Sequence, residues 1–173
     1  MTLFPDLFIA AAVAFRVATL AVSIRHERAL KRAGAEEHGA GTSALLAAAH
    51  VAFYLAAIAE GLWRAAPFDA VSLAGLLLYG FGAVLLLVVI RLLGRFWTVK
   101  LIVAPDHRLV EHPLFRRVRH PNYFLNILPE LAGFALALHA WATLAVGLPL
   151  YLVPLVLRIR QEERVMQARF EGY

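Results

Sequence analysis

Long apolar runs alternate with short polar segments along the chain. Three of these runs lie in its first half, at residues 7–24, 43–63 and 71–90. Each is close to the length of about 20 apolar residues that an α-helix needs to cross a bilayer core of about 30 Å. The pattern therefore predicts three transmembrane helices within residues 1–91, and Ser43 is placed to cap the second.

A fourth apolar stretch, 125–157, is too long for one ordinary span and slightly short for two. Its most polar interruption lies at His139, so we expect a tight hairpin of two shortish helices that turns there. Pro149 and Pro154 would kink the second helix, which neighbouring helices tolerate in a membrane. The pattern as a whole predicts an all-α, polytopic membrane protein of about five transmembrane helices.

Composition agrees with a membrane protein. The chain is 61% hydrophobic and 17% charged, whereas soluble domains are about 25% charged. It has no cysteine, which excludes disulfides, cysteine-ligated metals and thiol nucleophiles. Its 173 residues suit one domain. The first apolar run follows no basic segment and precedes no cleavage site, so we interpret it as a retained helix.

The basic residues indicate how the chain crosses the membrane. Of 17 lysines and arginines, all but Arg16 and Arg64 lie after the first predicted span, after the third, or in the C-terminal tail. Five spans place these three segments on one side, which the positive-inside rule makes cytoplasmic. We therefore expect an outside N-terminus and a cytoplasmic C-terminus. The net charge of +5 then indicates contact with membrane lipids rather than nucleic acid.

Arg16 is unusual because it falls near the middle of a predicted span, where an unpaired charge is costly. Glu130 lies at a comparable depth in the fourth span. We expect the two to pair or to share a polar cavity, with Glu60 as the alternative partner for Arg16.

The polar residues most typical of a functional site lie in the connection 93–123 and in the C-terminal tail. The connection is about thirty residues long and interleaves aromatic, histidine and arginine residues, and long loops of this kind are usually functional. In the tail, Arg158 and Glu162 are one helical turn apart. That spacing alone is typical of a solvated helix end. His107, His112 and His120 match no helical metal-binding spacing, so no metal site is predicted.

Several short motifs resemble one family. Arg-His-Pro-Asn-Tyr occupies 119–123, and Arg158 is followed by Glu162 and Glu163. Together with Gly-Arg-Phe-Trp-Thr at 94–98, this pattern resembles the isoprenylcysteine carboxyl methyltransferase family, whose wider group of membrane methyltransferases includes phospholipid N-methyltransferases. The resemblance covers residues 92–173, which also contain the pair Leu109 and Val110 and the ending Arg-Phe-Glu-Gly-Tyr. It is closest to a bacterial branch that methylates alkylpyrones or alkylresorcinols. One departure is His-Pro-Leu-Phe at 112–115, where the family often has Gly-Pro-Tyr.

The resemblance implies S-adenosylmethionine as the methyl donor, in a cytoplasmic pocket formed by the long connection and the last helix. Arg119 or Arg158 would bind the donor's carboxylate, and Glu162 or Glu163 its ribose hydroxyls or ammonium group. The cofactor-binding residues implied are Trp97, Leu109, Val110, Arg119, His120, Pro121, Tyr123, Arg158, Glu162 and Glu163.

Two of these residues, Pro121 and Trp97, have ordinary structural interpretations as well. Pro121 suits the first turn of a helix, and the free N–H groups after His120 would favour an anion. Trp97 and Tyr123 could stack on adenine, although Trp97 is equally typical of a membrane-interface anchor.

The methyl acceptor implied is a lipophilic small molecule that enters from the bilayer, with the enzyme in the bacterial inner membrane. The predicted catalytic residues are His120, Glu130 and Arg119, with His120 or Glu130 as base for a phenol or enol acceptor. Three alternatives remain open: phospholipid N-methylation, a membrane reductase that uses NADPH, and a non-catalytic membrane interaction protein. The pattern does not fix the oligomeric state.

Overall fold

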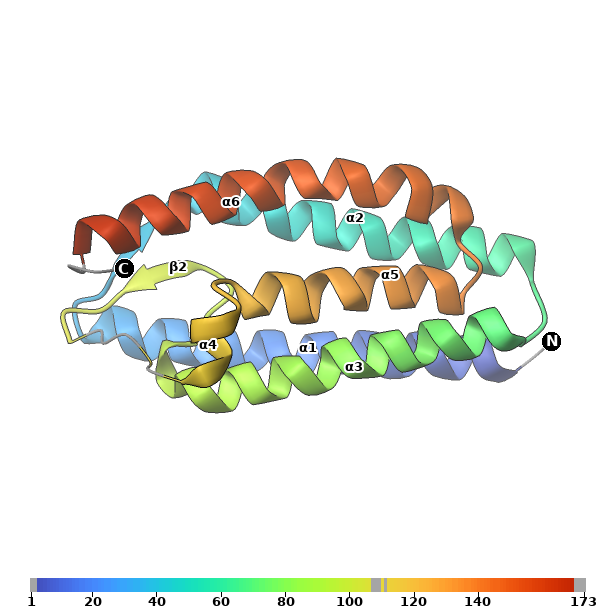
Figure 1. Ribbon diagram of the computed structural model, residues 1–173, viewed down its shortest axis with the longest axis horizontal. Coiled ribbons are helices and arrows are strands. Elements are labelled where there is room, and N and C mark those ends of the chain that lie inside the picture. The colour runs from blue at the N-terminus through green and yellow to red at the C-terminus, as the bar shows by residue number, and fades with distance from the viewer. Residues whose placement is uncertain (1–2, 107–109, 111, 170–173) are drawn as a thin grey trace.

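The protein is a bundle of long helices that run roughly parallel to one axis (Figure 1). The computed structural model describes residues 3–106, 110 and 112–169. The helices are α1 (Leu3–Arg32), α2 (Ala40–Arg64), α3 (Ala70–Leu93), the short η1 (Gly94–Phe96) and α4 (Pro113–Arg117), η2 (Asn122–Ile127) leading into α5 (Leu128–Ala137), and η3 (Thr143–Gly147) leading into α6 (Leu148–Arg169).

Four helices are long and apolar enough to cross a membrane in the part of the chain that the structure describes: Phe4–Arg32, Ala40–Arg64, Ala70–Phe96 and Thr143–Arg169. The remaining predicted span, the fourth along the chain, is η2 with α5. It is a shorter helix that also runs along the bundle axis (Figure 1). The predicted all-α membrane architecture is confirmed. The two termini lie at opposite ends of the bundle, as an odd number of passes requires (Figure 1).

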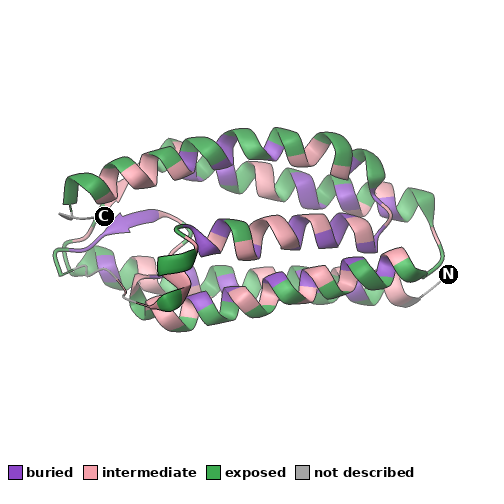
Figure 2. Ribbon diagram, viewed as in Figure 1, coloured by how far each residue is buried: buried purple, intermediate pink, exposed green. Residues whose placement is uncertain are grey.

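The outer surface of the bundle is apolar. Figure 2 shows exposed positions along the outward faces of the long helices, and many of these are large hydrophobic residues, among them Leu7, Val17, Leu77 and Leu150. Soluble monomeric proteins rarely expose so much contiguous apolar surface. The protein is therefore an integral membrane protein whose outward faces contact lipid.

Close backbone contact holds α5 against α3. A Cβ added to Gly75 would lie 2.3 Å from the backbone nitrogen of Ala137, and one added to Gly133 would lie 2.4 Å from that of Tyr79. Small residues let membrane helices approach until dispersion forces and side-chain packing hold them. Gly82 belongs to the same contact, since its Cβ would meet the Asn126 carbonyl at 2.9 Å.

Two turns of π-helix precede prolines. The turn η2 lies just before Pro129, and η3 lies just before Pro149. A proline within a helix removes one i→i−4 hydrogen bond and crowds the carbonyl four residues earlier. A π-turn widens the helix at that point. These local turns were not predicted from the sequence.

The predicted turn at His139 is present, and His139 itself has a positive φ of 55°. The two helices that it joins have different main partners, because α5 packs on α3 whereas α6 packs on α2. The turn is tight, as predicted, but the two helices that it joins pack on different partners within the bundle.

An ion pair lies inside the bundle between α1 and α5. Arg16 donates through Nε and Nη2 to both carboxylate oxygens of Glu130, whose side chain is 0% exposed. Tyr54 of α2 donates to the same carboxylate. The predicted pairing of Arg16 with Glu130 is confirmed. The alternative partner, Glu60, does not bind Arg16. It lies near the C-terminal end of α2, where it pairs with Arg64 and accepts a hydrogen bond from the Thr143 backbone nitrogen.

Three local expectations are corrected. Ser43 does not cap α2, which begins three residues earlier, at Ala40, because the left-handed conformation of Gly39 (φ 62°) starts the helix there. The first helix continues through the polar residues to Arg32, since their side chains pair along its surface. A short antiparallel strand pair, β1 (Glu36–His38) with β2 (Leu101–Val103), joins the connections after α1 and after α3, where no strand was predicted.

The glycine contact between α3 and α5 predicts opposite effects for two neighbouring substitutions. Gly75→Ala should destabilise the protein by about 1–3 kcal/mol, because the new methyl group overlaps the backbone of α5. Gly80→Ala should be neutral or slightly stabilising, because a Cβ at Gly80 meets nothing within 4 Å. Unfolding of both variants in detergent would measure this, and equal losses would contradict the contact.

The buried ion pair predicts a large loss when one partner is neutralised. Glu130→Gln should destabilise the protein by about 3 kcal/mol, because it leaves the Arg16 charge uncompensated inside the bundle. Arg64→Gln, which breaks the partly exposed pair with Glu60, serves as the control and should cost less than about 1 kcal/mol. Similar unfolding midpoints for the two variants would argue against a buried pair.

Candidate functional site

A cavity of about 490 Å³ lies at the end of the bundle that carries the C-terminus. Its walls come from the end of α3, the segment 97–102, α4, η2 and the last turns of α6, so elements far apart in sequence meet there. One part is aromatic and apolar and the other is polar and charged. The lining residues are Val89, Leu93, Phe96, Trp97, Thr98, Val99, Lys100, Leu101, Ile102, Val110, Phe115, Arg116, Arg119, His120, Pro121, Asn122, Tyr123, Arg158, Glu162 and Met166.

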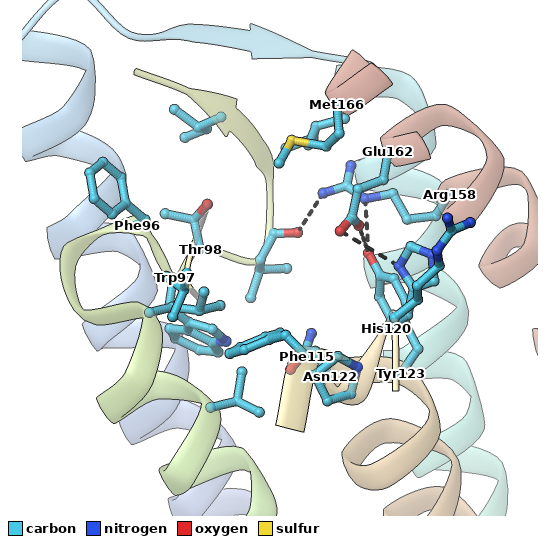
Figure 3. A pocket seen from close by; sticks show the side chains of 18 of the residues that line it. Phe96, Trp97, Thr98, Phe115, His120, Asn122, Tyr123, Arg158, Glu162 and Met166 are labelled. Atoms are coloured by element: carbon cyan, nitrogen blue, oxygen red, sulfur yellow. Dashed lines mark hydrogen bonds and ion pairs between the residues drawn. The ribbon is translucent and has the colours of Figure 1, made fainter. Parts of the chain in front are cut away.

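Arg158 is the central residue of the polar part (Figure 3). It is 2% exposed, and each of its three nitrogens has a partner. Nη1 donates to Ser43 Oγ at 2.7 Å, Nη2 to the Val99 carbonyl at 3.2 Å, and Nε to Tyr123 Oη at 3.3 Å. The guanidinium thereby fixes α2, the segment 97–102 and η2 against α6.

Glu162 lies one helical turn after Arg158 on the same face of α6. Its Oε2 accepts a hydrogen bond of 2.6 Å from the Tyr123 hydroxyl. Tyr123 therefore stands between the two, donating to the carboxylate and accepting from the guanidinium. Figure 3 shows this chain of contacts along one wall of the cavity. The spacing of Arg158 and Glu162 alone suggested a solvated helix end. That interpretation is wrong for Arg158, which is buried.

His120 lies directly before the first helical residue, Pro121, as the sequence predicted. Its Nε2 is 3.2 Å from Glu163 Oε1, and its Nδ1 is 3.8 Å from Glu162 Oε1. Burial disfavours the charged imidazolium, but hydrogen bonds and negative charge from Glu162 and Glu163 outweigh it and raise the pKa of His120. The imidazole ring also stacks on Tyr123, with centroids 5.8 Å apart.

The opposite part of the cavity is aromatic. Phe96, Trp97 and Phe115 line it together with Val89 and Leu93 of α3. Trp97 is 4% exposed, and its indole nitrogen is buried without a hydrogen-bond partner. This wall offers flat apolar surfaces and one unused donor.

Three further cations line the cavity. Lys100 binds Glu27 of α1 at 2.7 Å. Arg116 and Arg119 are exposed, and the side chain of neither makes a hydrogen bond or ion pair within the described part of the chain. With Glu162 as the carboxylate of the lining, the site presents an excess of positive charge.

The structure brings most of the predicted site residues together. Glu163 joins them through His120, although it does not line the cavity. Glu130 lies deeper in the bundle with Arg16 and is not part of the lining, and Leu109 lies outside the described residues. The predicted residues that line the cavity are Trp97, Val110, Arg119, His120, Pro121, Tyr123, Arg158 and Glu162.

Some residues of the site were missed. Ser43 was interpreted as a helix cap, but it accepts a hydrogen bond from Arg158. Phe115 and Asn122 line the cavity beside predicted residues. Asn122 was discoverable, because it lies inside the quoted Arg-His-Pro-Asn-Tyr motif. The role of Ser43 depends on how α2 packs on α6, which no local pattern encodes.

Fold and site together define a polytopic membrane protein with a combined polar and aromatic cavity at one end. The sequence model of the isoprenylcysteine carboxyl methyltransferase family matches residues 74–168, and the chain belongs to this family. An uncharacterised protein of Haemophilus influenzae is 46% identical over 168 residues, which cover 97% of this chain and 98% of the relative. The uncharacterised protein YpbQ of Bacillus subtilis is 31% identical over 167 residues, covering 93% and 95%. No solved structure matches the chain.

The raised pKa of His120 predicts a pH dependence of stability. The charged imidazolium binds Glu162 and Glu163 only in the folded protein, so its contribution is complete below about pH 6.5 and is lost as pH rises through the raised pKa. The melting temperature of the wild type should therefore fall between pH 6 and 8.5 more steeply than that of His120→Gln. Parallel profiles for the two proteins would contradict this assignment.

Proposed function

We propose that this protein is a membrane methyltransferase that uses S-adenosylmethionine to methylate an oxygen of a lipophilic acceptor. The observation that carries the proposal is the cavity itself. It joins a carboxylate and several cations to an aromatic, apolar wall, in a chain that belongs to a methyltransferase family. The bundle around it faces lipid, so a lipid-soluble acceptor is close at hand.

The residues present fit the donor. A volume of about 490 Å³ lies within the usual range of roughly 300–1,000 Å³ for small-molecule pockets. S-adenosylmethionine has a carboxylate, an ammonium group, ribose hydroxyls and a flat adenine, and the cavity offers guanidinium groups, a carboxylate and aromatic surfaces for them. Trp97 Nε1, a buried nitrogen without a partner, leaves one free hydrogen-bond donor at the wall.

The carboxylate of the donor is best assigned to Arg119. Arg158 already uses all three nitrogens within the protein, and moving it would release Ser43, Val99 and Tyr123. Arg119 is exposed and lines the cavity with its guanidinium free of other described partners. A planar guanidinium binds a carboxylate in a two-pronged arrangement. In this proposal Arg158 holds the walls and Arg119 holds the ligand.

Glu162 is the residue we assign to the ribose hydroxyls or the ammonium group. Tyr123 donates to Oε2, and Oε1 lies 3.8 Å from His120 Nδ1. This second oxygen retains capacity to accept from a ligand. The wall formed by Phe96, Trp97 and Phe115 would cover the adenine and the reacting oxygen and exclude water from both.

The charge of the cavity favours an anionic oxygen as acceptor. When bound, the cofactor supplies an electrophilic methyl group on a positively charged sulfur. Arg116, Arg119 and Lys100 would attract a carboxylate, phenolate or enolate and repel a protonated amine. Such an anion attacks without losing a proton, so no base is needed. A neutral phenol or enol would require a base, and His120 of the polar wall is our candidate to accept the proton.

We also propose that the cavity end of the bundle faces the cytoplasm of a bacterial cell. The connections and tail at this end contain most of the basic residues, which the positive-inside rule assigns to the cytoplasmic side. That orientation gives the cavity access to a water-soluble donor on one side and to the bilayer on the other.

Calorimetric titration of the detergent-solubilised protein with S-adenosylmethionine, S-adenosylhomocysteine and NADPH would test this function. We expect both adenosyl compounds to bind and NADPH not to bind. Glu162→Gln should weaken S-adenosylhomocysteine binding by about tenfold or more, because it removes a charged hydrogen-bond acceptor. Glu36→Gln, at an exposed residue of β1 outside the cavity, is the control. Binding of NADPH alone would instead favour a reductase, and binding of none of the three a non-catalytic protein.

A further inference from the structure

One wall of the cavity, the segment 97–100, is held by a helix that contributes no lining residue among those described. This helix is α1, and three of its side chains contact the segment. Ser23 Oγ accepts from the Val99 backbone nitrogen at 2.9 Å, His26 Nδ1 lies 2.9 Å from the Trp97 carbonyl, and Glu27 accepts from Lys100 at 2.7 Å. A carbonyl can only accept, so His26 Nδ1 carries the proton.

These three side chains share one face of α1. Residues three and four apart lie one above another on a helix, which aligns Ser23 with His26 and Glu27. Continued toward the bilayer, the same face carries Arg16, which binds Glu130. The face is buried at Ser23, which is 3% exposed, whereas Arg25 on another side of the helix is exposed.

The backbone of Val99 connects α1 to α6. Its N–H binds Ser23 of α1, and its carbonyl accepts from Arg158 of α6 at 3.2 Å. The extended backbone after Trp97 makes few hydrogen bonds of its own, apart from the contact of Thr98 with the Lys100 carbonyl. The position of the wall is therefore set by polar contacts from both sides.

We propose that Ser23 and His26 are positioning residues for the ligand site: they fix the wall 97–100 and so place Trp97 and its neighbours against the bound adenosyl cofactor. The inference rests on the proposed function. It assigns a role to α1, which precedes the family match at 74–168. Neither side chain touches the cavity, so each acts through the backbone of the wall.

The effect of losing Ser23 or His26 on ligand binding should be separable from any effect on the stability of the bundle. Independent contacts anchor α1 elsewhere, namely the ion pair of Arg16 with Glu130 and the edge-on packing of Phe8 on Tyr79 with ring centroids 5.2 Å apart. Loss of one hydrogen bond at Ser23 or His26 leaves those contacts in place. The wall would become mobile while the helix stays docked.

A matched set of variants tests the proposal in the full-length protein. Ser23→Ala and His26→Leu remove the two contacts, His26→Asn keeps an N–H near the position of Nδ1, and Arg25→Ala is the control on the exposed side of the same helix. Binding of S-adenosylhomocysteine is measured by calorimetry, melting temperature by thermal unfolding, and backbone exchange at 97–100 by hydrogen–deuterium exchange.

We expect Ser23→Ala and His26→Leu each to weaken binding by about three- to tenfold, the range for one hydrogen bond. Exchange at 97–100 should rise in both, with melting temperatures close to that of the wild type. His26→Asn and Arg25→Ala should bind as the wild type does. This rescue would not occur if the ring of His26 served only to fill space.

The failures of the two proposals are distinguishable. If the wild type binds no adenosyl compound, the proposed function is overturned, and the ligand of this inference with it. If the wild type binds and Ser23→Ala and His26→Leu bind equally well, the positioning role alone is overturned. Unchanged exchange at 97–100 in both variants would also overturn it, because the wall would not depend on α1.

Discussion

The buried guanidinium of Arg158 is the interaction on which the site depends. A charge at 2% exposure inside a membrane protein is tolerable only when the surrounding groups replace its hydration. Here a hydroxyl from α2, a carbonyl from the segment 97–102 and a phenol from η2 do so. The same contacts that pay for burying the charge also bring four separate elements to one place. The cavity is the space that these elements enclose, so its shape follows from satisfying one arginine.

A second constraint acts along the α3–α5 contact. Glycine contacts hold these helices at backbone distance, which leaves no freedom for α5 to slide or rotate. The orientation of the Asn126 amide is assigned from its hydrogen-bond partners. In that orientation its nitrogen donates to the Gly82 carbonyl and to Glu130, both at 3.2 Å, and so extends this contact. Asn126 and Tyr123 both lie in the π-turn η2. The rigid helix contact therefore sets where the Tyr123 hydroxyl meets Arg158 and Glu162.

The sequence predicted those features that follow from the bilayer alone. Apolar runs predicted the helices, and the cost of a lone charge predicted the pairing of Arg16 with Glu130. Eight of the ten predicted cofactor-binding residues line the cavity. The π-turns before Pro129 and Pro149 were not predicted. The strand pair and the contact of Ser43 with Arg158 were not predicted either, because each depends on partners distant in sequence. Ser43 shows why. Its position in the sequence suits a helix cap, but in the fold its hydroxyl oxygen accepts a hydrogen bond from the buried Arg158 of α6.

Helix length explains why a cavity forms at one end of the bundle and why it is half polar. The central helix begins only at Pro121, whereas α1 and α6 extend at this end to Arg32 and Arg169 (Figure 1). The extensions beyond the apolar spans carry polar side chains, and the long connection after α3 folds between them. Its apolar side faces α3, and its backbone polar groups face α1 and α6. The cavity therefore has an aromatic wall beside α3 and a charged wall beside α6, an arrangement that suits the proposed reaction between a soluble donor and a membrane-dissolved acceptor.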